Sequence, residues 1–193
     1  MILGNHDMNL KNSGRLDAIS PIVDNLNHPN LHFHKHSEVI EVADGIDLHV
    51  LSIVDPENWQ ETLPEERVNI ALYHGSVVGS VTDTGWMMTH GDIDLNTVEK
   101  YDYALLGDIH KTDQKVDADG RARYPGSLVQ QNHGESNDKG YLIWEIEDKN
   151  KWSTRHVSLV NPKPFITIEL TRKGRMPKNV SVPLGARLRL VSN

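Results

Sequence analysis

The chain has 193 residues, which allow one sizeable domain or one domain with part of a second. Its 37% hydrophobic and 24% charged residues exclude an extensively disordered chain, and no apolar run approaches the roughly 20 residues that span a bilayer. The net charge of -7 argues against a nucleic-acid partner. The chain has no cysteine, which excludes disulfides and thiolate chemistry.

The first third of the chain predicts one helix followed by strands. Residues 13–26 carry apolar side chains at helical spacing, and Pro21 within them predicts a kink or a late start. Residues 31–36 alternate between apolar and polar side chains, as a strand does. Residues 38–42 and 46–54 flank Asp44-Gly45, a two-residue hairpin signal.

The remaining elements predict an α/β protein with few long helices. Residues 68–73 and 103–106 are short apolar runs that read as buried strands, and each leads into a turn containing glycine and histidine. Further segments complete the pattern, with a short helix at 96–101 and strands at 141–146, 155–160, 165–170 and 187–191. Catalytic candidates then fall at the carboxyl ends of buried strands, where open α/β sheets usually place their sites.

The charge is unevenly distributed along the chain. Residues 161–193 hold seven basic residues and one acidic residue, which gives this segment a net charge of +6 and leaves a net charge of -13 for residues 1–160. Such a split predicts an acidic body with a basic appendage, and Pro162-Lys163-Pro164 marks the boundary. The appendage reads equally well as a solvated strand pair or as a surface that contacts nucleic-acid phosphates.

Three short stretches carry the residue types of a metal site: GNHD at 4–7, YHG at 73–75 and GDIH at 107–110. Asparagine and aspartate oxygens and histidine nitrogens all bind divalent ions such as manganese, and glycine allows the sharp turns that point short side chains at one centre. Each stretch alone is typical of a surface turn, whereas the three together are more specific.

In this order and spacing, the stretches resemble the later motifs of the calcineurin-like metallophosphoesterases. LLGDIHK at 105–111, YPGSLVQQNHGE at 124–135 and KGYLIWEI at 139–146 resemble, more narrowly, the nuclease subunit of SbcCD-type double-strand-break repair complexes. The closest likeness is to its tailed-phage version, the recombination endonuclease subunit, over residues 4–170. The resemblance implies an α/β sandwich of two packed mixed β-sheets flanked by helices, here without its first strands.

The resemblance also implies the metal ligands. The family uses two metal ions, which activate a water for attack on a phosphodiester. By motif match, Asn5, His74 and Asp108 would hold one metal, and His110 would bind the other. The family usually has histidine at the position of Asp108; a carboxylate there keeps a ligand and favours Mn²⁺ or Mg²⁺.

Two further residues of the first stretch have implied roles. His6 would contact the scissile phosphate or protonate the leaving group, which suits an imidazole with a pKa near 6.5. Asp7 would either orient His6 or serve as a turn or N-cap residue for the helix that follows.

Taken as a whole, the resemblance implies a manganese-dependent DNA exonuclease or endonuclease. It also implies a homodimer that works with an SbcC-type ATPase, in the cytoplasm of a bacterium or a phage-infected host. The family's upstream Asp-x-His and Gly-Asp motifs have no counterpart here. We therefore expect a poorly active fragment with half a metal site: a partial nuclease core at 1–160 and an incomplete basic cap at 161–193. The alternatives are a phosphoesterase with a non-DNA substrate and a catalytically inactive binding module.

Overall fold

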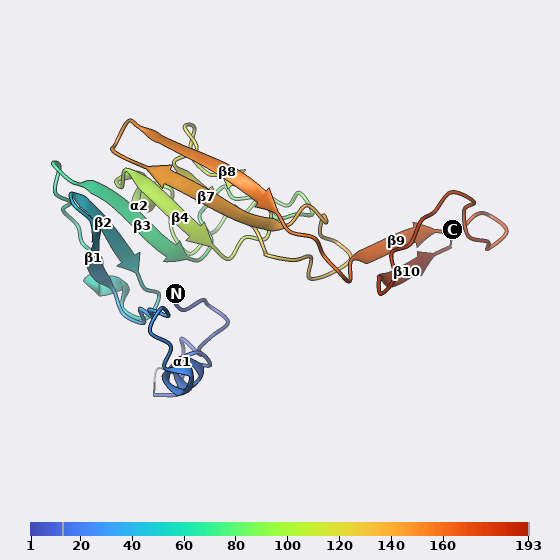
Figure 1. Cartoon of the computed structure of the whole chain (residues 1–193), viewed down its shortest axis with the longest axis horizontal. Helices are drawn as coiled ribbons and strands as arrows, with labels where there is room; N and C mark the ends of the chain where they lie inside the picture. The colour runs from blue at the N-terminus through green and yellow to red at the C-terminus, as the bar shows by residue number, and fades with distance from the viewer. Residues whose placement is uncertain (13, 193) are drawn as a thin grey trace.

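The computed structural model describes residues 1–12 and 14–192, and its centre is a six-stranded mixed sheet (Figure 1). The strand order is β1-β2-β3-β4-β6-β5; β2, β3, β4 and β6 run parallel, and the two outer strands are antiparallel to their neighbours. The bounds are β1 Glu38–Ala43, β2 Ile46–Leu51, β3 Val68–His74, β4 Tyr103–Gly107, β5 Gln114–Lys115 and β6 Ala122–Tyr124.

The predicted hairpin and the two predicted buried strands are confirmed. β1 pairs with β2 around Asp44-Gly45, where Gly45 has a φ of 72°, a conformation that glycine adopts without steric cost. β3 and β4 pair in parallel from Ile70↔Tyr103 to His74↔Gly107, so both strands end at the same level of the sheet. The residues that follow them are therefore brought side by side.

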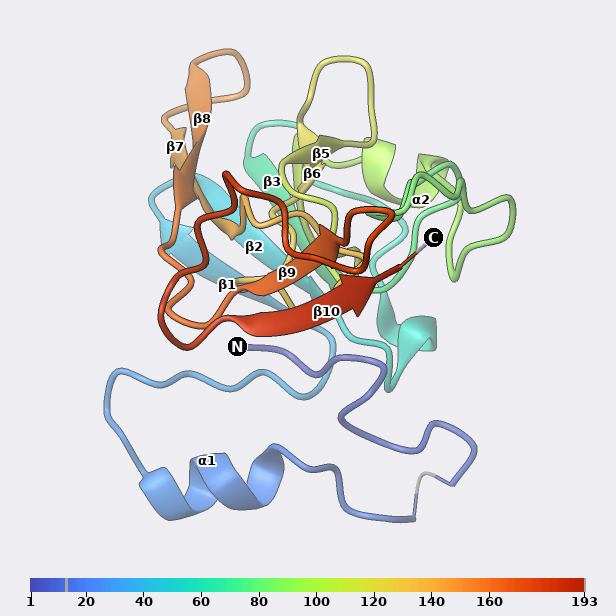
Figure 2. The ribbon, with the colours of Figure 1, turned by 90° about the vertical axis from the view of Figure 1, so that its right-hand side faces the viewer.

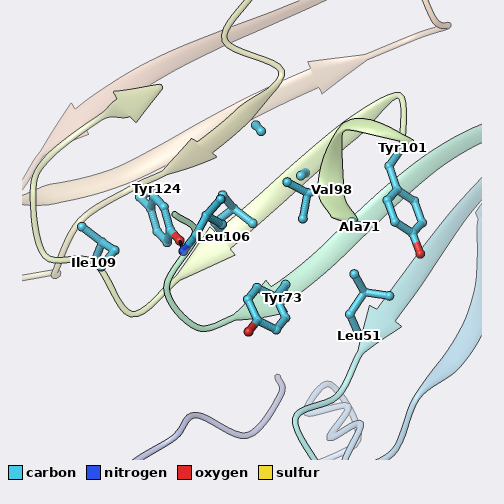
Figure 3. Close-up of a cluster of buried hydrophobic side chains, with 11 residues drawn as sticks. Leu51, Ala71, Tyr73, Val98, Tyr101, Leu106, Ile109 and Tyr124 are labelled. Atoms are coloured by element: carbon cyan, nitrogen blue, oxygen red, sulfur yellow. Dashed lines mark hydrogen bonds between the residues drawn. The ribbon is translucent and has the colours of Figure 1, made fainter. Parts of the chain in front are cut away.

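The core lies on both faces of this sheet because side chains alternate along β3 and β4. On one face, Ala71, Tyr73 and Leu106 pack in a buried cluster with Tyr124 (Figure 3). Loops and the short helix α2 (Asn96–Glu99) cover this face. On the other face, the buried Tyr103 contacts two tryptophans of a separate β-hairpin, β7 (Gly140–Ile146) and β8 (Trp152–Ser158).

The expected α/β sandwich is wrong for the residues that the structure describes. Strands and bridges make up 31% of the chain and helices only 7%, and the sheet that packs opposite the central one is the two-stranded β7–β8 hairpin. The helices are too short to flank a sheet: α1 (Ser20–Leu26) has seven residues and buries none of them, α2 has four, and η1 (Pro56–Asn58) is a single 3-10 turn.

The segment before β1 also differs from the sequence expectation. Pro21 occupies the first turn of α1, so the helix starts late; the predicted start, residue 13, lies outside the described residues. Residues 31–36 do not form a strand and make only the isolated bridge Ile2↔His34. Side chains hold this segment instead: the buried Asp17 carboxylate accepts hydrogen bonds from the N–H groups of residues 19 and 20 and pairs with Lys35 at 2.7 Å.

Beyond β8, the chain forms a pair of parallel strands at one end of the molecule, apart from the central sheet (Figure 1). Viewed from that end, β9 and β10 lie in front of the body (Figure 2). β9 (Phe165–Glu169) pairs in register with β10 (Arg187–Val191). The Gln130 side chain links this pair to the body, because it accepts from Phe165 N at 2.8 Å and donates to Phe165 O at 3.1 Å. The predicted boundary at residues 162–164 falls between β8 and β9, and the division into two domains stays a prediction.

Among the described helices, none has the length and apolar character needed to traverse a bilayer.

Candidate functional site

A pocket of about 830 Å³ lies at the carboxyl ends of β3 and β4. Four segments line it: the turn at residues 4–7, the last residue of β3, residues 107–110 at the end of β4, and residues 126–129 with Gln131. All six residues singled out in the sequence are among the lining residues: Asn5, His6, Asp7, His74, Asp108 and His110. Residues separated by up to 105 positions along the chain are thus gathered around one open space.

The N-terminal turn reaches the pocket because the first residues are anchored to the chain before β1. The Met1 ammonium donates to His32 O at 2.6 Å, His34 N donates to Met1 O at 2.9 Å, and Leu3 is buried. Two hydrogen bonds between Gly4 and Asp7 close the turn. Asp7 N donates to Gly4 O at 3.0 Å, and Gly4 N donates to the Asp7 carboxylate at 2.7 Å.

This geometry gives Asp7 a structural role in the turn. Its carboxylate is engaged with the Gly4 N–H, and among the described residues no hydrogen bond joins it to His6. The nearest described helix begins only at Ser20, so Asp7 does not cap it. His6 sits at the tip of the turn and is exposed, which leaves its imidazole accessible to a molecule in the pocket.

The His74 ring is enclosed by two glycines. A Cβ on Gly4 would lie 2.7 Å from His74 Nε2, and a Cβ on Gly107 would lie 2.9 Å from Nδ1, so no larger residue fits at either position without movement. Burial lowers the pKa of His74, although the Asp108 charge opposes this effect. His74 is therefore a neutral imidazole near pH 7, the form that binds metal ions.

Asn5, His74 and Asp108 converge within the pocket. Asn5 Nδ2 donates to Asp108 Oδ1 at 3.1 Å, and His74 Nε2 lies 3.7 Å from the same oxygen. The Asn5 Oδ1 atom is buried and has no hydrogen-bond partner among the described residues. Asp108 has a φ of 100°, a conformation that is costly for a residue with a side chain and that clusters at functional sites.

Tyr124 holds the loop that follows His74. Its buried hydroxyl donates to Gly75 O at 2.8 Å and accepts from Val77 N at 2.9 Å. Burial raises the pKa of Tyr124 to about 12, so the phenol stays protonated and keeps its donor. The sequence motifs gave no indication of this contact, because it joins residues 47 and 49 positions apart.

His110 is held by a carboxylate that the motifs did not single out. His110 Nδ1 lies 2.9 Å from Glu135 Oε1, and Lys139 Nζ donates to the His110 carbonyl at 2.6 Å. Burial opposes the ionisation of Glu135, but hydrogen bonds from Gln131 N and His110, with the Lys139 charge, outweigh it and hold its pKa below the usual value. In the sequence, Glu135 is the last residue of the stretch at 124–135, and no role was predicted for it.

The donor set fits a single hard or borderline divalent ion. Across residues 1–12 and 14–192, no three His, Asp or Glu side chains form a ready metal-binding group. The converging trio includes only two such side chains, His74 and Asp108, with the amide of Asn5. The unpartnered Asn5 oxygen is nevertheless a free ligand, and amide oxygen, carboxylate oxygen and imidazole nitrogen together suit Mn²⁺.

Comparison with known proteins does not assign a family. No family model matches the chain. The chain is 32% identical, over an alignment of 202 residues, to the uncharacterized protein R555 of Acanthamoeba polyphaga mimivirus. The alignment takes in 99% of this chain and spans 14% of the length of that relative.

Proposed function

We propose that this pocket binds one divalent cation, with Mn²⁺ as the preferred ion, and that the chain is a metal-dependent phosphodiester hydrolase of the SbcCD nuclease type. One observation carries the proposal. The six residues that the motif resemblance selects, from three separate stretches, line a single pocket. The proposal concerns the chemistry of the site and does not extend to the sandwich fold.

Asn5, His74 and Asp108 would hold the ion through one amide oxygen, one imidazole nitrogen and one carboxylate oxygen. His110, which lines the same pocket, would add a second imidazole nitrogen. A bound divalent ion would polarise a phosphoryl oxygen and lower the pKa of a bound water. His6 would hold a proton at its imidazole for the leaving oxygen, so that the alkoxide departs as an alcohol when the P–O bond breaks. Its exposure at the tip of the turn allows contact with a long substrate.

DNA is the proposed substrate. The basic side chains after residue 160 are all exposed on and around the β9–β10 pair, which supports contact with a polyanion. The SbcC-type ATPase partner, the homodimer and the cytoplasm of a bacterium or a phage-infected host belong to the same proposal and rest on the motif resemblance.

A cleavage assay tests the proposal. Linear double-stranded DNA and bis(p-nitrophenyl) phosphate would be incubated with the full chain in Mn²⁺ and in EDTA, with His6→Ala and the control His28→Ala. His28 is an exposed imidazole outside the pocket. We expect cleavage of DNA that needs Mn²⁺, falls at least about 100-fold in His6→Ala and is unchanged in His28→Ala.

Other outcomes would overturn parts of the proposal. Cleavage of the small diester but not of DNA would favour a phosphoesterase with a non-DNA substrate. DNA binding without cleavage in any metal would favour a catalytically inactive binding module. Equal cleavage by wild type and His6→Ala would remove His6 from the mechanism.

A further inference from the structure

A group of buried charged side chains lies directly behind His110. The Glu135 side chain is 5% exposed and the Lys139 side chain 1% exposed, and Lys139 also pairs with Asp83, whose side chain is 10% exposed. Charged side chains are rarely buried to this extent unless they are paired.

Glu135 is the centre of the group. Its Oε1 atom lies 2.9 Å from His110 Nδ1 and accepts from Asn132 Nδ2 at 3.0 Å, while Oε2 accepts from Gln131 N at 2.9 Å. Both carboxylate oxygens are thus engaged by donors that come from different parts of the chain. The carboxylate has no freedom to turn away from the His110 ring without breaking these bonds.

Lys139 holds His110 through the backbone carbonyl of His110. Its ammonium donates to the His110 carbonyl at 2.6 Å and to Asp83, and it lies 3.8 Å from Glu135 Oε2. His110 is therefore held at two points, its carbonyl by Lys139 and its ring by Glu135.

Buried ion groups of this kind are a poor source of net stability. The cost of removing the charges from water offsets most of the attraction, and apolar replacements are often equally stable. What the group does supply is a defined orientation. An ionised carboxylate only accepts hydrogen bonds, so the nitrogen that faces Glu135 must carry the proton, and the other ring nitrogen keeps its lone pair.

We propose that Glu135 is a positioning residue that fixes the His110 imidazole with Nδ1 protonated and Nε2 free for the pocket. The inference rests on the proposed function, in which the free nitrogen serves as a metal ligand. A carboxylate that accepts from the remote nitrogen of a ligating histidine fixes the tautomer and ring orientation, and its loss typically lowers metal affinity 10- to 100-fold.

The test is a long-range ¹⁵N–¹H correlation spectrum of the full chain, labelled at histidine and free of metal. His110→Gln identifies the His110 signals among the eleven histidines. We expect wild type to show the Nδ1-protonated tautomer for His110, and Glu135→Gln, which keeps the side-chain volume, to show a mixture of both tautomers.

Asp55→Asn is the matched control. Asp55 is a largely buried carboxylate that bonds Ser37 and contacts His36 at 3.1 Å, and neither Asp55 nor His36 lines the pocket. This variant should alter the His36 signals and leave those of His110 unchanged. An Nε2-protonated His110 in wild type would overturn the inference without any need for the Glu135 variant. An unchanged tautomer in folded Glu135→Gln, or an equal change in Asp55→Asn, would overturn it too.

Calorimetric titration with MnCl₂ separates this inference from the proposed function. If wild type binds Mn²⁺, Glu135→Gln should bind it 10- to 100-fold more weakly and Asp55→Asn should bind it equally well. Absence of Mn²⁺ binding by wild type would contradict the proposed function, while the tautomer spectrum would still decide the role of Glu135.

Discussion

Replacing Gly4 with alanine should damage the proposed metal site without removing any ligand. The new Cβ would lie 2.7 Å from His74 Nε2, whereas ordinary van der Waals contact begins at 3.4 Å, so the ring or the turn must move by about 0.7 Å. Gly107 bounds the same ring, which restricts its escape. Metal–ligand distances are defined to within about 0.2 Å, so a shift of this size displaces a ligand.

We expect the Mn²⁺ affinity of Gly4→Ala to fall about 10- to 100-fold, or about 1.4–2.8 kcal/mol. The assay is calorimetric titration with MnCl₂, with circular dichroism to verify the fold. Gly14→Ala is the control, because among the described residues its Cβ would meet only Asn12 Oδ1, at an ordinary 3.6 Å. Wild-type affinity in folded Gly4→Ala would refute the placement of His74 as a ligand beside this turn.

Two further predictions concern stability, measured by urea unfolding. Tyr124→Phe should lower the free energy of unfolding by about 1–3 kcal/mol, because it leaves the buried Val77 N–H without a partner. Tyr101→Phe is the comparison and should be neutral or stabilising, because the buried Tyr101 hydroxyl has no partner among the described residues. Arg67 holds the pKa of Asp47 below its usual value, so the ionised carboxylate stabilises the fold above about pH 4 and loses this effect as pH falls further. Asp47→Asn should therefore show a shallower loss of stability below about pH 4, and an unchanged slope would contradict this.

The strands at the centre of the fold could be predicted from sequence because their signals are local. β3 and β4 are apolar runs of the right length, and the β1–β2 hairpin is marked by its turn residues. Since parallel strands end together, the convergence of His74 and Asp108 follows from the same signals. The approach of Asn5 does not, because it depends on the anchoring of Met1 and on the turn closed by Asp7.

The errors arise where long-range contacts override local pattern. Apolar spacing predicted a helix over residues 13–26, but of the described residues 14–26 only Ser20–Leu26 is helical, and this helix buries no residue. Without long helices, the predicted sandwich does not form. The contacts of Glu135 with His110 and of Lys139 with Asp83 span 25 and 56 positions, and no spacing rule connects them.

The most direct measurement is a calorimetric titration of the full chain and of His74→Ala with MnCl₂. We predict one binding site in wild type, formed by Asn5, His74 and Asp108 with His110 as a further ligand, and loss of that binding in His74→Ala. Absence of binding in wild type, or equal binding by both proteins, would contradict the assignment of this pocket as a metal site.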